Sequence, residues 1–295
     1  MAGSAQAAAT TRGTSTIHSE RLKWMRRGTR LILYTYLTIG ALLVLIPYFW
    51  MVSASLKEPK EIFQVGVNFL PKTFYTENYR ILFGDYQIVR WLLNSFAVAG
   101  IVLLTNMTFT VTAGYAFARL RFKGRDFMFF VYVGAMMVPL QVRLIPSFII
   151  VKNLGWLDTY QGIASIQLIE FFGIFLIRQF MLNFPRELED AARIDGCNWF
   201  RVLWQIILPN SRPALAALAI FTFTASWNNF LWALVVINKP DWMTIQVGLS
   251  SMKGEIIPWG VLMAGTFISA LPLAILYVML QRLFVQGIVT SGIKG

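Results

Sequence analysis

Six long apolar runs constrain this chain more than any other feature of its sequence. A transmembrane helix needs about 20 consecutive, mostly apolar residues, and each of the six runs is long enough. Of the 295 residues, 57% are hydrophobic and 14% are charged, whereas charged residues make up about 25% of an ordinary soluble domain. The sequence therefore predicts an all-α, polytopic membrane protein with six transmembrane helices. The predicted helices cover approximately residues 31–53, 91–117, 127–151, 160–182, 213–237 and 258–284.

The two ends of the chain lie outside these runs. Residues 1–30 are rich in Ala, Ser and Thr and end in a basic cluster, so they are predicted to form a disordered, basic tail. The run that follows exceeds the 7–15 apolar residues of a signal peptide, which favours an uncleaved first helix. The sequence thus divides into the tail 1–30, one transmembrane domain over 31–285, and a C-terminal tail over 286–295.

The distribution of basic residues predicts the orientation in the membrane. An even number of spans puts both termini on one side. About two thirds of the 26 Lys and Arg residues lie on that side, in the termini, the loop 119–126 and the segment 187–209. Basic residues concentrate in cytoplasmic loops. Both termini and the segment 187–209 are therefore expected to be cytoplasmic.

The segment 187–209 is charged and amphipathic, and it separates the fourth and fifth runs. Its first half contains good helix formers, Gly196 interrupts the pattern, and a second apolar-rich half ends at Pro209. We expect two short helices with a bend near Asp195 and Gly196, lying at the membrane surface. From the pattern alone, the segment is either a solvated loop helix or a docking element for a soluble partner.

Polar residues inside two of the runs are candidates for a substrate pathway. Glu170 is the only acidic residue deep in a predicted span, where an unpaired carboxylate is costly. It serves either the pathway or a tie to an Arg or Asn of another helix. The fifth run carries Thr222, Ser226, Asn228 and Asn229. Such groups suit an uncharged, polyhydroxylated solute, or they form hydrogen bonds between helices.

Several functional classes are excluded by what the sequence lacks. One Cys and one His cannot build a disulfide framework or a Cys/His metal cluster, and no Gly-rich phosphate loop ending in Gly-Lys-Ser/Thr is present. We therefore expect no catalytic residue, no metal site and no cofactor in this chain. The net charge of +12 fits the cytoplasmic bias of basic residues, so no nucleic-acid partner is predicted.

Several motifs resemble one family of transporters. Asp190-Ala-Ala, followed by Gly196 and by Leu208-Pro209, resembles the EAA signature of the membrane subunits of bacterial ABC importers, with Asp190 in place of the usual Glu. The C-terminus over 281–295 resembles the second permease subunit of maltose-type importers (MalG-like). Other parts are similar to sugar-importer permeases, namely residues 77–80, 113–125, 137–146, 154–159 and 226–232.

The resemblance implies a role for the segment 187–209 and a set of partners. In such importers this segment is the cytoplasmic coupling helix between spans 4 and 5, which docks on an ATPase subunit. A second permease subunit (MalF-like), two ATP-binding subunits that hold ATP and Mg, and an extracytoplasmic solute-binding protein complete the assembly in the bacterial inner membrane. The residues expected to contact the ATPase are Glu189, Asp190, Ala191, Ala192, Asp195 and Gly196.

This reading makes the chain a transport subunit for a sugar or oligosaccharide and not an enzyme. Two alternatives stay open at this point. One is an ABC importer of another solute, such as glycerol 3-phosphate. The other is a secondary transporter driven by an ion gradient, in which Glu170 carries the proton.

Overall fold

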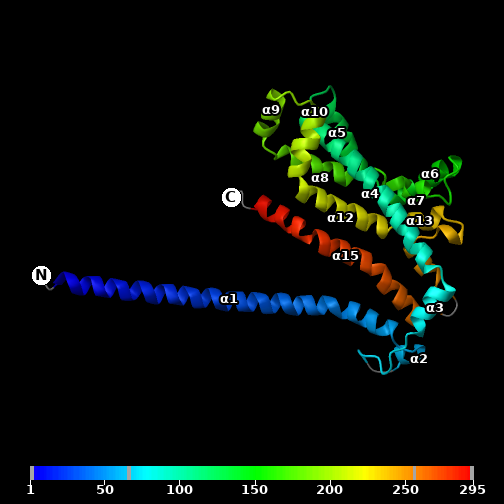
Figure 1. The fold of residues 1–295 in the computed structure, drawn as a ribbon, viewed down its shortest axis with the longest axis horizontal. Helices are drawn as coiled ribbons and strands as arrows, with labels where there is room; N and C mark the ends of the chain where they lie inside the picture. Colours follow the sequence, from blue (N-terminus) through cyan, green and yellow to red (C-terminus); the bar gives the residue numbers. More distant parts are fainter. Residues whose placement is uncertain (1–2, 65–67, 255–256, 293–295) are drawn as a thin grey trace.

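The chain is helical throughout the part that the structure, a computed structural model, describes. That part comprises the backbone of residues 3–64, 68–254 and 257–292 and the side chains of 28–64, 68–254 and 257–283. It contains no β-strand, which confirms the all-α prediction (Figure 1). In chain order the helices are α1 (Gly3–Ser55), α2 (Pro59–Ile62), α3 (Glu77–Asp85), α4 (Ile88–Arg119), α5 (Arg125–Ala135), α6 (Leu140–Asn153), α7 (Tyr160–Ala164), η1 (Ser165–Gln167), α8 (Phe171–Leu182), α9 (Arg186–Ile194), α10 (Trp199–Arg201), η2 (Val202–Ile207), α11 (Leu208–Asn210), α12 (Arg212–Trp227), α13 (Leu231–Val236), η3 (Pro240–Trp242), α14 (Ile245–Ser251) and α15 (Trp259–Gly292).

Three helices are long and apolar enough to cross a membrane by themselves. They are α1 from Gly28 to Ser55, α4, and α15 from Trp259 to Leu283. Three further pairs of helices are long and apolar enough only when the two helices of each pair are taken together, and each pair is bent. The described residues therefore hold up to six candidate spans if each bent pair counts as one. The chain is therefore a multi-pass membrane protein, and the number six stays a prediction.

The bent pairs show where the continuous spans predicted from the sequence are broken. The axes of α5 and α6 differ by 99°, and those of the α7–η1 unit and α8 by 50°. Pro139 precedes α6, and proline restricts the residue before it and donates no backbone hydrogen bond. The fifth predicted span, 213–237, is also interrupted, because α12 ends at Trp227 and α13 begins at Leu231. A further bend of 83° separates α12 from the helical stretch Trp199–Asn210.

Helical backbone extends beyond the first and last predicted spans at both ends of the chain. The helix α1 begins at Gly3, so helical backbone covers most of the tail 1–30 that was predicted to be disordered. Ala has the highest helix propensity, and adding residues to an existing helix costs less than starting one. At the other end, α15 continues to Gly292 into the predicted tail 286–295, while residues 293–295 lie outside the described residues.

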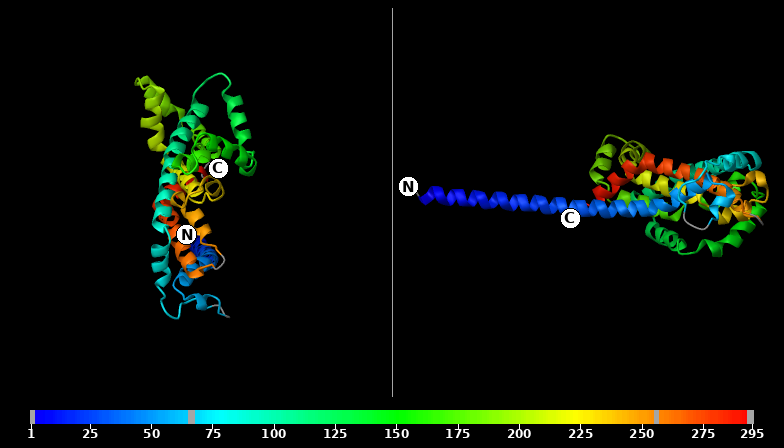
Figure 2. Two further views of the ribbon diagram at one scale, coloured as in Figure 1. Left: turned by 90° about the vertical axis from the view of Figure 1, so that its right-hand side faces the viewer. Right: turned by 90° about the horizontal axis from the view of Figure 1, so that it is seen from below.

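The helix α4 lies at the centre of the bundle, and α1 lies beside α15 at its edge (Figures 1 and 2). Each of three buried apolar clusters includes residues of α4. The first joins Trp91 to α14 and α15, the second joins the end of α4 to Ile177 of α8 and to η2, and the third joins its middle to Trp232 of α13.

A glycine permits the close approach of α4 and α8. A Cβ at Gly114 of α4 would lie 2.7 Å from the side chain of Ile177 in α8. Small residues let membrane helices approach closely, and dispersion contacts are then the main attraction between them. The contact fixes α8 against the half of α4 that leads to Arg119, and so it positions the surface segment that follows α8.

Candidate functional site

The helix α9 forms the first half of the segment 187–209, and local sequence explains both of its ends. Pro185 precedes it in an extended conformation, and Glu187 and Glu189 lie in its first turn, where carboxylates interact favourably with the helix dipole. At its other end the N–H of Gly196 donates to the carbonyl of Arg193, and the N–H of Cys197 donates to the carbonyl of Ala192.

These two bonds make the Schellman turn that commonly ends a helix. The turn needs a left-handed residue, and Gly196 has φ = +86°. A side chain there would meet open space, so only the backbone conformation requires glycine. The predicted bend at Asp195 and Gly196 is confirmed.

The second half of the segment is a helix of mixed winding. The side chain of Asn198 accepts a hydrogen bond of 2.9 Å from the backbone of Arg201 and caps α10. The chain then continues as one π-helical stretch, η2, and ends at α11. Three buried residues of η2, Val202, Leu203 and Ile207, anchor it in the same cluster as the end of α4.

On the helix α9 a charged side chain is buried and apolar side chains are exposed. Glu189 and Ala192 face the protein and are only 5% and 6% exposed. Leu188 and Ile194 face outward, 48% and 86% exposed, and Ala191 between them is exposed as well. Residues three apart share a helix face, so Leu188, Ala191 and Ile194 form one exposed apolar face of α9, flanked by exposed charged residues, and the buried face carries a carboxylate.

This arrangement separates the six residues that were predicted to contact an ATPase. Asp190, Ala191, Asp195 and Gly196 are exposed and remain candidates. The side chains of Glu189 and Ala192 are buried within this chain and are not available at the surface. The sequence pattern does not reveal this, because Glu189 and Asp190 are adjacent and equally acidic.

Glu189 forms a buried ion pair with Arg119, the last residue of α4. The two side chains are 2.7 Å apart, and only 3% of the Arg119 side chain and 6% of the Glu189 side chain are exposed. The guanidinium of Arg119 also donates to the carbonyl of Phe184, just before α9. Burial raises the pKa of the Glu189 carboxyl above its usual value, and the charge of Arg119 opposes that rise. The pair fastens α9 to the central helix of the bundle.

Sequence reasoning missed the role of Arg119, which was counted only as one cation of a basic loop. Its position at the end of a predicted span was the available signal. Nothing local in the sequence connects it with a carboxylate 70 positions later.

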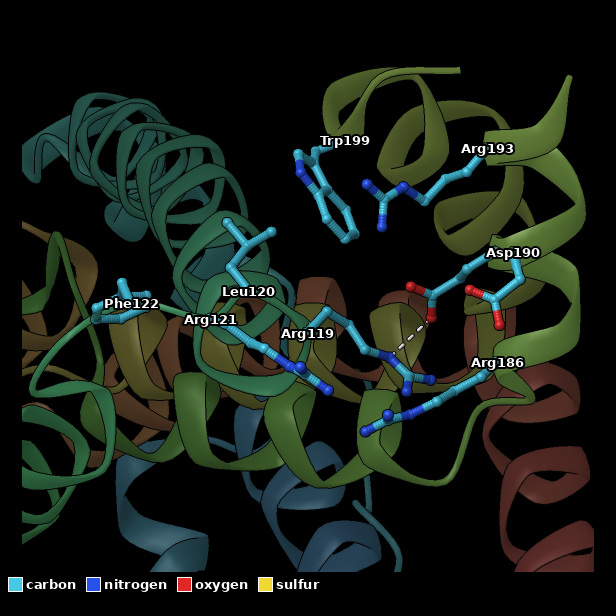
Figure 3. Close-up of a pocket in the computed structure, with 9 residues that line it drawn as sticks. Arg119, Leu120, Arg121, Phe122, Arg186, Asp190, Arg193 and Trp199 are labelled. Atoms are coloured by element: carbon cyan, nitrogen blue, oxygen red, sulfur yellow. Dashed lines mark ion pairs between the residues drawn. The ribbon is translucent and has the colours of Figure 1, made fainter. Parts of the chain in front are cut away.

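A pocket of about 610 Å³ lies between the loop after α4 and α9. Figure 3 shows the guanidinium groups of Arg121 and Arg186 reaching into it from opposite sides, next to Arg119. Arg193 closes one end, with its guanidinium 3.8 Å from the ring centre of Trp199. Glu189 and Asp190 supply the acidic groups of the pocket.

The predicted pathway residues do not form one site. Glu170 and Asn229 line one cavity of about 570 Å³, together with Arg143 and Gln167. Asn229 donates a hydrogen bond of 3.0 Å to the side chain of Gln167, which sequence reasoning had not singled out. Glu170 sits at the break before α8, and not inside a continuous helix.

The other three candidates lie elsewhere. Asn228 lines a separate cavity of about 570 Å³ between α12, α14 and α15. Thr222 and Ser226 are buried in α12, and their hydroxyl groups have no hydrogen-bond partner among the described residues. Within the described residues, no three His, Cys, Asp or Glu side chains are close enough to hold a metal ion.

The chain is similar to transport proteins along most of its length. Residues 110–290 match the family described as "Binding-protein-dependent transport system inner membrane component". The permease protein AraQ of an arabinooligosaccharides transport system in Halalkalibacterium halodurans is 33% identical over 282 residues, which cover 92% of this chain and 100% of that protein. The permease protein UgpE of an sn-glycerol-3-phosphate transport system in Yersinia pestis is 32% identical over 276 residues, 90% of this chain and 98% of that one.

Solved structures agree with these relatives. A chain of a bacterial ABC transporter involved in the import of the acidic polysaccharide alginate has 25% sequence identity and a TM-score of 0.76, covering 87% of this chain and 96% of that chain. A chain from a bacterial alginate ABC transporter in complex with an alginate pentasaccharide-bound periplasmic protein has 14% identity and a TM-score of 0.62, and this likeness shows the fold alone.

Proposed function

Because the chain belongs to the family of binding-protein-dependent transport system inner membrane components, we propose that it moves a sugar or oligosaccharide and receives its driving force through α9. The chain is a multi-pass permease subunit of an ABC importer and not an enzyme. Family membership also argues against the alternative of an independent secondary transporter driven through Glu170.

The outward apolar face of α9 carries the proposal. Leu188, Ala191 and Ile194 are exposed, although an isolated amphipathic helix normally buries its apolar side. Exposed apolar surface rimmed by charges is typical of a protein-binding site. Asp190 and Asp195 supply such charges beside it. We assign this face to an ATP-binding partner subunit, which would hold the ATP and Mg.

The Glu189–Arg119 ion pair supports a mechanical role for the same helix. A helix that transmits movement has to be fixed to the part that moves, and the pair joins α9 to α4 with almost no exposure to solvent. The bend at Gly196 and the buried residues of η2 add a second attachment. A displacement of α9 would therefore be passed to α4 and α12.

The rest of the assembly follows from the same proposal. A related second permease subunit would complete the pathway, and an extracytoplasmic solute-binding protein would deliver the solute. Both termini and α9 would face the cytoplasm. Candidate groups along the pathway are Glu170, Thr222, Ser226, Asn228 and Asn229, with Gln167 joined to Asn229.

Glycerol 3-phosphate is the second candidate solute, because UgpE proteins are nearly as similar to this chain as AraQ. Arg143 lines the same cavity as Glu170 and is the cation best placed to meet a phosphate there. Uptake of radiolabelled arabino-oligosaccharides and of glycerol 3-phosphate by vesicles that contain the complete importer separates the two candidates.

The docking proposal is tested by recovery of the partners. The chain is purified from native membranes in mild detergent as wild type, as Asp190→Lys and as Glu187→Lys, an exposed acid on the same helix that serves as the control. We expect ATPase subunits to copurify with the wild type and with Glu187→Lys, and to be lost from Asp190→Lys. Equal recovery of the ATPase with all three proteins would show that α9 does not dock it through this face.

A further inference from the structure

The pocket between α4 and α9 contains more positive charge than its own residues neutralise. Four arginines line it, at 119, 121, 186 and 193, against the two carboxylates of Glu189 and Asp190. Arg119 is already paired with Glu189. Among the described residues, Arg121 and Arg186 have no hydrogen-bond or ion-pair partner, yet both extend into the pocket (Figure 3). Like charges held this close repel one another unless an anion lies between them.

The position of the pocket indicates where such an anion comes from. Arg119 is the last residue of α4, a helix long and apolar enough to span the membrane, so we place the pocket beside one end of that span, next to the membrane surface. Its rim includes Leu120 and Phe122, the latter 41% exposed. The next helix presents Phe127 and Phe130, which are 71% and 76% exposed. Apolar side chains beside a cationic pocket match the two parts of a phospholipid.

We propose that this pocket binds the phosphate headgroup of an anionic phospholipid through Arg121 and Arg186. Guanidinium groups suit phosphate oxygens because they offer paired N–H donors. The pocket volume of about 610 Å³ exceeds what a bare phosphate needs and admits a glycerol-linked headgroup. Basic pockets beside membrane helices bind anionic lipid headgroups in this manner. The acyl chains would lie along α5, against Phe127 and Phe130.

The bound lipid would steady the attachment of α9. Arg121 belongs to the loop after α4, and Arg186 is the first residue of α9. A phosphate between them would join these two elements beside the Glu189–Arg119 pair and would reduce the repulsion among the arginines. Of the exposed residues assigned to the ATPase contact, only Asp190 also lines the pocket. This inference does not require that contact, because the proposed phosphate ligands are Arg121 and Arg186.

Lipid binding to the complete importer in mild detergent tests the proposal directly. Phosphatidylglycerol is titrated into the wild type and into the double variant Arg121→Ala/Arg186→Ala, and bound lipid is counted by native mass spectrometry. Within the part of the chain that the structure describes, neither side chain makes a hydrogen bond or an ion pair, and both residues are exposed, so the double variant is expected to fold. Arg201→Ala is the matched control, because Arg201 is exposed on the same segment but does not line the pocket.

We expect the double variant to bind phosphatidylglycerol about thirtyfold more weakly than the wild type, as the loss of two arginine contacts to an anionic lipid implies. Arg201→Ala should bind as the wild type does, and phosphatidylcholine should not compete. Equal binding by the double variant and the wild type would overturn the proposal. Displacement of phosphatidylglycerol by millimolar inorganic phosphate would overturn the lipid assignment and would identify a soluble anion instead. Because the assay measures lipid alone, its outcome does not depend on ATPase docking.

Discussion

Removing the positive charge of the buried ion pair should destabilise the protein in a strongly pH-dependent manner. In Arg119→Met, the Glu189 carboxylate keeps its burial and loses its nearest counter-charge. Burial already raises its pKa, with Arg119 as the first of the charges that oppose the rise. The folded-state pKa of Glu189 must therefore rise further in the variant, while its value in the unfolded chain stays at about 4.3.

The size of the effect follows from the geometry. Two unit charges 2.7 Å apart attract by about 6 kcal/mol at an effective dielectric constant of about 20. Measured costs of breaking a buried pair are about 3–5 kcal/mol. Arg186 and Arg193 also favour the ionised carboxylate, so we expect a loss of about 3 kcal/mol in the free energy of unfolding at pH 7.5. The stability linked to a raised carboxyl pKa is present below the unfolded pKa and lost above the folded pKa.

The assay is equilibrium unfolding in mixed detergent micelles at several pH values. The deficit of Arg119→Met should be largest at neutral pH and should shrink as the pH falls toward the unfolded pKa. Adding Glu189→Met should restore most of the stability at neutral pH, because an apolar pair of similar volume can replace a buried ion pair. Glu189→Gln alone should cost less than Arg119→Met, since Arg119 keeps its hydrogen bond to the carbonyl of Phe184 in that variant.

Two results would refute this reasoning. One is an Arg119→Met protein as stable as the wild type at pH 7.5. The other is a double variant in which the losses of the two single substitutions simply add, because residues that interact do not behave independently.

Three further predictions concern the packing, the surface bend and the pathway. Gly114→Ala should lower the free energy of unfolding by about 1–3 kcal/mol by overpacking against Ile177, which a lower midpoint of thermal unfolding would show. Gly100 lies on the same helix with open space around it, so Gly100→Ala should leave the midpoint unchanged or raise it. Gly196→Ala should cost about 1 kcal/mol of stability because φ = +86° is unfavourable for alanine, and Gly196→Asn should cost less; equal unfolding midpoints for the two would contradict this. Asn229→Ala should raise the solute concentration for half-maximal uptake by up to about tenfold, the effect of one lost hydrogen bond, and unchanged uptake would remove Asn229 from the pathway.

The features that the sequence predicts well are those that depend on local composition. Apolar runs of sufficient length identify α1, α4 and α15 because the bilayer imposes that length on any helix that spans it. The bend at Gly196 is equally local, since a left-handed helix end favours glycine. The predicted family also rested on local motifs, and the match over residues 110–290 confirms that prediction.

The features that the sequence did not predict depend on contacts between distant residues. In the sequence Glu189 looks like any surface acid. In the structure the packing of α8 on α4 places Arg119 next to it. Thr222, Ser226 and Asn229 were predicted together as pathway candidates, and of these three only Asn229 lines one of the cavities described above. The break after Trp227 redirects the chain beyond α12, and helical periodicity does not extend through it.

The placement of α1 has a consequence for the order in which the molecule is built. This helix packs chiefly against α15, the last candidate span among the described residues. Only 11% of the apolar stretch that qualifies α1 as a span is buried within this chain. During synthesis, α1 enters the membrane first and has to wait for nearly the whole chain before its principal neighbour arrives. The contact that closes the bundle is therefore also the most distant in sequence. A chain interrupted before α15 would therefore leave α1 without its principal neighbour within this chain.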